Sequence, residues 1–236
     1  MRYIYGPVKS RRLGLSLGVS LTPHKTCSFD CVYCQLGKTT ILTQERKDYI
    51  NTDEILSELK WFLQNKVQPC DYISLSGYGE PLLNAGINKL IRGIKGLSPI
   101  PVVLITNASL LVEPGARRDV LEADLLVPSL DAVTQDVFEK IDRPAPGIKI
   151  GDILAGLIAL RREFKGKIYL EIMLVKGVND SLEYASKFKE AIDKINPDKI
   201  QLNIPVRSTA EDWVRPPEKE RLLEIRDILG SKCEII

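Results

Sequence analysis

The sequence lacks the features of a secreted, membrane-spanning or strongly basic protein. Its 236 residues include one histidine, two methionines, two tryptophans and five cysteines. No window approaches the roughly 18 consecutive apolar residues of a membrane span. The odd number of cysteines, with no apolar secretory segment at the start, argues against a disulfide framework. We therefore expect a cytoplasmic protein in a reducing compartment, with no membrane partner.

Charge and composition set further limits. The formal net charge is +2 and the pI is near 8.2, below the value of about 9 that is usual for a nucleic-acid-binding domain. This mild charge does not demand a nucleic-acid partner, but it does not exclude one. The chain is 44% hydrophobic and 27% charged, as in ordinary globular domains. Its length predicts a single domain over 1–236, with a basic arm (1–14), a core (15–230) and a tail (231–236).

Three of the cysteines lie close together. Cys27, Cys31 and Cys34 are separated by three and then two residues, in a segment that we call the cysteine loop (residues 25–34). Clustered thiolates suit zinc or an iron–sulfur cluster. A closed structural zinc site or a ferredoxin-type cluster needs four protein ligands. Three cysteines therefore leave one position of the bound centre open.

One alternative uses the single histidine. His24 stands three residues before Cys27, so His24 and the three clustered cysteines would make a Cys3His zinc module without enzymatic activity. Packing is a weaker alternative, because free cysteines are often buried as small hydrophobic residues. It suits the remote Cys70 and Cys233 better than the clustered three.

Apolar segments with strand and helix periodicity alternate along the chain, which predicts an α/β fold with parallel strands. The basic arm, with its glycines and proline, is expected to be loop. The predicted strands are 15–21, 72–76, 102–105, 124–127, 168–175 and 199–204. The cysteine loop follows the first strand, at the end where α/β barrels place their active sites. Glu171 interrupts the apolar fifth strand, and whether it faces the interior depends on the register.

The cysteine spacing, with Tyr33 directly before the last cysteine, resembles the cluster motif of the radical S-adenosylmethionine (SAM) superfamily. The resemblance implies a partial (βα)6 TIM-type barrel that is open. It also implies a [4Fe-4S] cluster on the three cysteines, SAM as second cofactor and a reduced flavodoxin or ferredoxin as electron donor. The implied activity is reductive SAM cleavage to a 5'-deoxyadenosyl radical for hydrogen abstraction, an oxidoreductase or lyase type of reaction.

Further motifs follow the next strands. Gly77-Tyr78-Gly79-Glu80 ends the second strand and resembles the glycine-rich motif that contacts the SAM amino group. Ser129 and Asp131 end the fourth strand and resemble the ribose motif. For Thr106 and Asn107, after the third strand, helix capping and a SAM contact are both open. For Tyr33, packing and a place beside the cofactor are both open.

The substrate is not apparent from the motifs. Gly6 to Gly18 with the cysteine loop resembles a branch related to the radical domain of wybutosine-forming tRNA enzymes. Arg11, Arg12, Arg143 and Arg207 are candidate substrate contacts, because arginine binds phosphate well. Nucleic acid, in particular tRNA, is therefore the first expectation, although a basic arm is often merely solvated. Radical activation of a peptide, a protein or a small metabolite is the alternative.

Overall fold

The structure is a computed structural model and describes residues 1–66 and 69–236. The strands are β1 (Ile4–Ser10), β2 (Gly14–Ser20), β3 (Thr26–Cys27), β4 (Ile41–Leu42), β5 (Tyr72–Ser76), β6 (Val102–Thr106), β7 (Leu125–Pro128), β8 (Lys167–Met173), β9 (Lys199–Asn203) and β10 (Cys233–Ile235). The helices are α1 (Thr52–Asn65), α2 (Ile87–Leu97), α3 (Pro114–Asp119), α4 (Gln135–Ile141), α5 (Ile150–Glu163), α6 (Leu182–Ile195) and α7 (Lys219–Leu229), with a 3-10 turn η1 (Pro81–Leu83).

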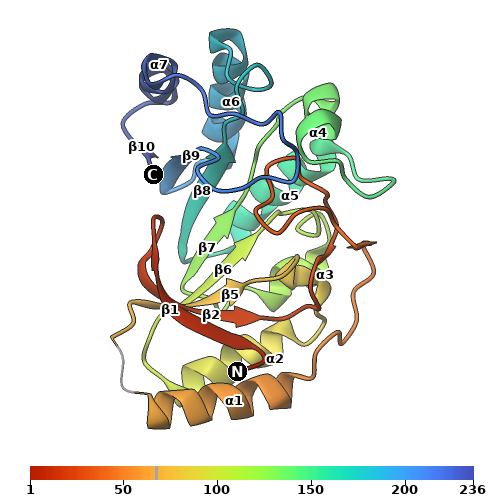
Figure 1. The fold of residues 1–236 in the computed structure, drawn as a ribbon, viewed down its shortest axis with the longest axis vertical. Coiled ribbons are helices and arrows are strands. Elements are labelled where there is room, and N and C mark those ends of the chain that lie inside the picture. Colours follow the sequence, from red (N-terminus) through yellow and green to blue (C-terminus); the bar gives the residue numbers. More distant parts are fainter. Residues whose placement is uncertain (67–68) are drawn as a thin grey trace.

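The main sheet has the strand order β1-β2-β5-β6-β7-β8-β9-β10. All its neighbours pair in parallel except β1 and β2. Figure 1 shows the sheet curving, with α1 and α2 below β2 and β5 and with α4, α5 and α6 on the same outer side farther along. The predicted α/β fold with six core parallel strands is confirmed, and the curved sheet is a partial barrel.

Each strand has an outer face toward the helices and an inner face toward the barrel interior. On β2 the outer residues Leu17 and Val19 belong to the main core with the helices. A second apolar cluster lies inside and contains only strand residues and the hairpin residue Leu13: these are Leu13, Val103, Leu125 and Val127, with Tyr72, Ile105 and Tyr169 packed on them. This interior cluster fills part of the barrel, and polar inner residues line the rest, among them Ser16 and Ser74, which bond to each other, and Glu171 on β8.

One expectation for the ends of the chain was wrong, and the other end adds a strand that was not predicted. The arm expected to be loop contains β1, which pairs antiparallel with β2. The tail contains β10, which pairs in parallel with β9. Gly6 and Pro7, which suggested a loop, lie where the β1 register shifts between Tyr5 and Val8. Glycine and proline are tolerated at such a bulge on an edge strand.

The turn between β1 and β2 reaches the opposite end of the sheet. Figure 1 shows this turn rising beside the C-terminus and β10. We call residues 10–14 the hairpin tip. Arg11 donates to the Asn203 side chain on β9 and to the Ile236 carbonyl, so side chains link the two edges of the open barrel. In the described part of the chain, no helix has the length and apolar character needed to cross a membrane.

Candidate active site

The cysteine loop is fastened to the glycine-containing turn after β5. The Lys25 N–H donates to the Tyr78 carbonyl at 2.5 Å, and the Glu80 N–H donates to the Thr26 carbonyl at 3.1 Å. A Cβ at Gly79 would lie 1.8 Å from the Thr26 carbonyl oxygen. Only glycine therefore permits this close approach of the two loops. The assignment of this turn to the SAM amino group stays a prediction, and Gly79 in addition lies against the cysteine loop.

The other side of the cysteine loop rests on the segment that follows α4. The Asp30 N–H donates to the Asp142 carbonyl at 3.0 Å, and the Val32 N–H donates to the Ile141 carbonyl at 2.9 Å. Phe29 forms an isolated bridge with Pro144. Phe29 and Val32 are buried. Buried apolar anchors and backbone bonds on two sides thus hold the loop that carries the three thiols.

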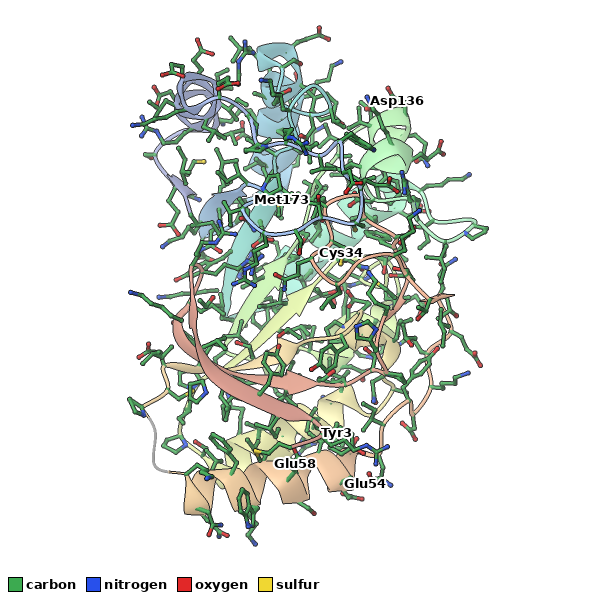
Figure 2. All side chains as sticks on the ribbon, viewed as in Figure 1. Tyr3, Cys34, Glu54, Glu58, Asp136 and Met173 are labelled. Atoms are coloured by element: carbon green, nitrogen blue, oxygen red, sulfur yellow. The ribbon has the colours of Figure 1, made fainter. Side chains whose placement is uncertain are left out.

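Each thiol of this loop has a different polar neighbour. Asn107 Nδ2 lies 3.6 Å from Cys27 Sγ, and Cys31 Sγ lies 3.4 Å from Asp142 Oδ1. Lys25 Nζ lies 3.2 Å from Cys34 Sγ. Figure 2 shows Cys34 in the middle of the molecule, far from the Glu54 and Glu58 side chains of α1. An amide, a carboxyl and an ammonium group thus surround the three sulfurs.

The donor set fits an iron–sulfur cluster. All three cysteines are free and partly buried. Burial raises the pKa of Cys27 to about 12 and raises the pKa of Cys31 well above its ordinary range. Such thiols keep their protons in the absence of a cation, and metal ions bind thiolates by displacing those protons. The burial of the thiols therefore favours a site in which iron supplies the compensating positive charge.

Glu80 is bonded within the protein. It is 2% exposed and accepts hydrogen bonds from Thr106 Oγ1 at 2.6 Å, the Asn107 N–H at 2.8 Å and the Leu82 N–H at 3.0 Å. Burial raises the pKa of Glu80 to about 7, while these donors act in the opposite direction. Its carboxyl group thus ties the end of β5 to the end of β6. Direct contact of Glu80 with SAM stays a prediction.

The fourth-strand motif contacts the cysteine loop. Tyr33 donates its hydroxyl hydrogen to Asp131 Oδ2, and the Met173 N–H donates to Asp131 Oδ1 at 2.6 Å. Burial raises the pKa of Asp131 to about 6. Ser129 is half-buried beside Glu171. The structure thus joins Tyr33 and Asp131 directly, and Ser129 lies two residues earlier on the same segment.

Three of the four candidate arginines gather near the hairpin tip. Arg12 Nη2 donates to Glu171 Oε1 at 2.7 Å, and Arg12 Nε donates to Oε2 of the same carboxylate. Burial and the nearby charges of Arg11 and Arg207 lower the pKa of Arg12, while the direct contact with Glu171 favours its charged form. Arg207 donates to the Gln35 side chain at 2.6 Å. A cavity of about 580 Å³ opens beside Arg207, lined by residues 205–209, 212 and 214–216.

The fourth candidate arginine lies apart from this group. Arg143 Nη1 donates to Glu211 Oε1 at 2.5 Å, and the Glu211 N–H donates to the Val32 carbonyl. Arg143 thus helps to hold residue 211 on the cysteine loop. Its charge is balanced by a carboxylate, as is the charge of Arg12, whereas Arg207 bonds to an amide oxygen.

Residues far apart in sequence complete the inner face, and the motifs did not indicate them. Glu171 lies on the same face of β8 as Tyr169 of the interior cluster, which answers the register question that the sequence left open. Asn203 accepts from Arg11. The Gln201 side-chain oxygen is buried without a hydrogen-bond partner among the described residues. The only signal in the sequence is a polar residue at alternate positions of an apolar strand.

The histidine that would complete a zinc site has other neighbours. The His24 ring lies 5.6 Å from the Tyr78 ring, between centroids, and the His24 side chain is exposed. Within the described residues, no three His, Cys, Asp or Glu side chains form a group suited to a single metal ion. A cluster differs from a single ion because its cysteines bind separate irons. Cys70 and Cys233 lie outside the site, and Cys233 is buried.

Three similar sequences cover most of this chain and carry different names. The chain is 34% identical over 232 residues to a UPF0026 protein of Methanocaldococcus jannaschii, covering 98% of this chain and 72% of that protein. It is 42% identical over 232 residues to a protein of Brachyspira hyodysenteriae named GTPase Obg, of which it spans only 34%. It is 28% identical over 219 residues to a probable dual-specificity RNA methyltransferase of a Thermotoga species, covering 89% of this chain and 61% of that protein.

Solved structures share the fold. A radical SAM methyltransferase from Sphaerobacter thermophilus superposes with a TM-score of 0.67 at 18% identity, covering 94% of this chain and 65% of that one. TYW1 with a lysine-pyruvate adduct bound superposes with a TM-score of 0.63 at 19% identity, covering 91% and 72%. The Radical SAM superfamily model matches residues 21–188. This chain therefore belongs to the radical SAM superfamily, whose cofactors are a [4Fe-4S] cluster and SAM, and to its UPF0026 group.

Proposed function

We propose that Cys27, Cys31 and Cys34 bind the [4Fe-4S] cluster and that SAM lies over the ends of β5, β6 and β7. When bound there, the cluster would supply the electron that cleaves SAM to methionine and a 5'-deoxyadenosyl radical. The observation that carries the proposal is the polar neighbour of each thiol: Asn107 after β6, Asp142 after α4, and Lys25 of the cysteine loop itself. The three cysteines would hold the cluster and leave one of its coordination positions open to SAM.

The residues of the chain orient the cofactors. The turn 77–80 is assigned to the amino group of SAM, and Glu80 positions it by binding Thr106 and the Asn107 N–H. Ser129 and Asp131 are assigned to the ribose, with Asp131 held by Tyr33 and by the Met173 N–H. Because these groups bond to one another before SAM binds, little reorganisation is needed on binding. Asn107 connects the turn 77–80 to the cysteine loop, because its N–H donates to Glu80 and its side chain contacts Cys27.

We further propose an anionic substrate, with RNA, in particular tRNA, as the first candidate. Arg207 donates to the Gln35 amide oxygen and pairs with no carboxylate among the described residues, so its charge remains available for phosphate. A relative named as an RNA methyltransferase agrees with this choice. The cavity beside Arg207 has the volume of a small-molecule site. A small metabolite, or a segment of a peptide or protein, is therefore the second candidate.

The proposed activity is tested under anaerobic conditions. The reconstituted protein, reduced with dithionite, should convert SAM to methionine and 5'-deoxyadenosine, measured by mass spectrometry. His24→Ala should retain its full iron content and activity, because His24 packs on Tyr78. A protein that binds one zinc ion, and loses it in His24→Ala, would show instead a Cys3His zinc module.

The substrate class is tested by isotope transfer. Deuterated cell extract is separated into RNA, protein and small-molecule fractions, and each is incubated with the reduced enzyme and unlabelled SAM. Deuterium in 5'-deoxyadenosine from the RNA fraction alone supports the first candidate. Transfer from another fraction alone contradicts it and identifies the substrate class.

A further inference from the structure

Lys25 is a buried cation that the cysteine motif does not require. Lys25 is only 3% exposed. Lysine is almost never buried to this extent without a partner for its charge. Its Nζ donates to Cys34 Sγ at 3.2 Å. The hydrogen-bond partner of this ammonium group is thus a sulfur atom, and a buried positive charge needs negative charge nearby.

The backbone fixes the position of this lysine. Lys25 has φ = +54°, a left-handed conformation that costs free energy for a residue with a Cβ. Its N–H donates to the Tyr78 carbonyl, and its carbonyl accepts from the Thr40 and Ile41 N–H groups. The strained conformation is therefore held on both sides, and it is the conformation in which the side chain reaches Cys34.

We propose that Lys25 is a positioning residue that holds a fixed positive charge against the Cys34 corner of the cluster and thereby raises the midpoint potential of the cluster. The inference rests on the proposed function, since it needs Cys34 as a cluster ligand. Reduction adds one electron from a low-potential donor such as reduced ferredoxin or dithionite, with no bond made or broken. A nearby positive charge and a hydrogen bond to sulfur both stabilise the more negative, reduced state.

The loop provides a matched control. The Lys38 side chain is 70% exposed and its Nζ lies 3.8 Å from Glu211. Lys25→Met and Lys38→Met change the net charge equally, but water screens the charge at position 38. Lys25→Gln keeps a hydrogen-bond donor without the charge. Lys25→Arg keeps the charge.

The experiment measures cluster potential rather than enzyme activity. Each variant is reconstituted anaerobically without SAM, its iron and sulfide are counted, and the reduced cluster is followed by electron paramagnetic resonance during a potentiometric titration. We expect Lys25→Met and Lys25→Gln to lower the equilibrium constant for reduction at least tenfold, which equals about 59 mV for one electron. Lys38→Met should remain within a factor of two, and Lys25→Arg should recover most of the effect.

Each outcome decides between the hypotheses. Loaded Lys25→Met and Lys25→Gln proteins with the wild-type potential would overturn the role of Lys25 while leaving the proposed function intact. A wild-type protein that binds no cluster would contradict the proposed function itself. If the two neutral variants fail to take up iron but Lys25→Arg is loaded, the charge is needed for cluster binding, and the potential of Lys25→Arg decides the proposal: a value near that of wild type supports it, and a value at least 59 mV lower contradicts it. If Lys25→Arg also fails, the residue acts through packing and the proposal is wrong.

Discussion

The two sides of the barrel mouth are built in different ways. On the side of β5, β6 and β7, polar groups bond mainly to residues that also end a strand or belong to the cysteine loop, as Glu80 does with Thr106 and Asn107. On the side of β8, β9 and the hairpin tip, the bonds join distant parts of the chain: Arg12 with Glu171, and Arg11 with Asn203.

This difference in hydrogen bonding suggests that the β5–β7 side is a preformed binding site, whereas the side of β8, β9 and the hairpin tip can adapt to its ligand. On the first side, both carboxylate oxygens of Glu80 and of Asp131 already accept hydrogen bonds, as suits a site whose ligand is the same throughout the superfamily. The exception there is Thr26 Oγ1 of the cysteine loop, which is buried without a partner among the described residues. On the second side, Arg207 bonds to an amide oxygen and to no carboxylate in the described part of the chain, and Gln201 has a buried oxygen without a partner among the described residues. We infer that the cofactor binds on the first side and that the substrate is selected on the second.

The largest expected effect tests the first side. Cys31→Ala should abolish cluster binding and SAM cleavage, because two cysteines remain for a centre that requires three. Iron and sulfide contents after reconstitution measure the loss. Cys70→Ala, at a half-buried cysteine outside the site, should keep the wild-type iron content. Full loading of Cys31→Ala would remove the basis of the proposed ligand set.

The next effect tests the second side. Arg12→Met leaves the Glu171 carboxylate, whose side chain is 7% exposed, without its partner, which should lower the free energy of unfolding by about 3–5 kcal/mol. Arg12→Met with Glu171→Met should recover most of that loss, because no buried charge remains. Urea denaturation measures both. A double variant as unstable as the single one would show that the lost packing of Arg12, and not the unpaired charge, is the cause.

Glu80, on the first side, makes the free energy of unfolding of the protein depend on pH. Burial raises its pKa from 4.5 to about 7, so the folded state binds the proton more tightly than the unfolded state. The free energy of unfolding should therefore fall as pH rises from about 4.5 to about 7, by about 3 kcal/mol from this group. Glu80→Gln should flatten this part of the curve. An equally steep curve in Glu80→Gln would assign the dependence to another group.

The smallest effect sharpens the substrate side. If Arg207 contacts one phosphate, Arg207→Ala should reduce the slope of log K for RNA binding against log salt concentration by about one in magnitude. Arg143→Ala is the control, because Glu211 already balances that charge. Fluorescence anisotropy with bulk tRNA measures both slopes, and SAM cleavage without substrate should be unchanged in both variants. Equal slopes in Arg207→Ala and wild type would exclude that phosphate contact.

Local patterns in the sequence determined most of the fold and the cofactor side. Six strands followed from periodicity, and the cysteine spacing placed three thiols in one loop, because both depend on residues close in the chain. The same reasoning failed at the ends. Gly6 and Pro7 signalled a loop, whereas β1 accommodates them at a register shift and still pairs with β2.

Only the tertiary structure decided which charged side chains of the site contact one another. The Arg12–Glu171 pair joins residues 159 apart in the chain, and Arg11 reaches Asn203 only because the sheet curves until the hairpin tip meets β9. The direction of Lys25 likewise depends on the Tyr78 carbonyl that holds its backbone. Sequence spacing predicts which groups share an element, but the curvature of the sheet and the packing of loops set which charges meet across elements.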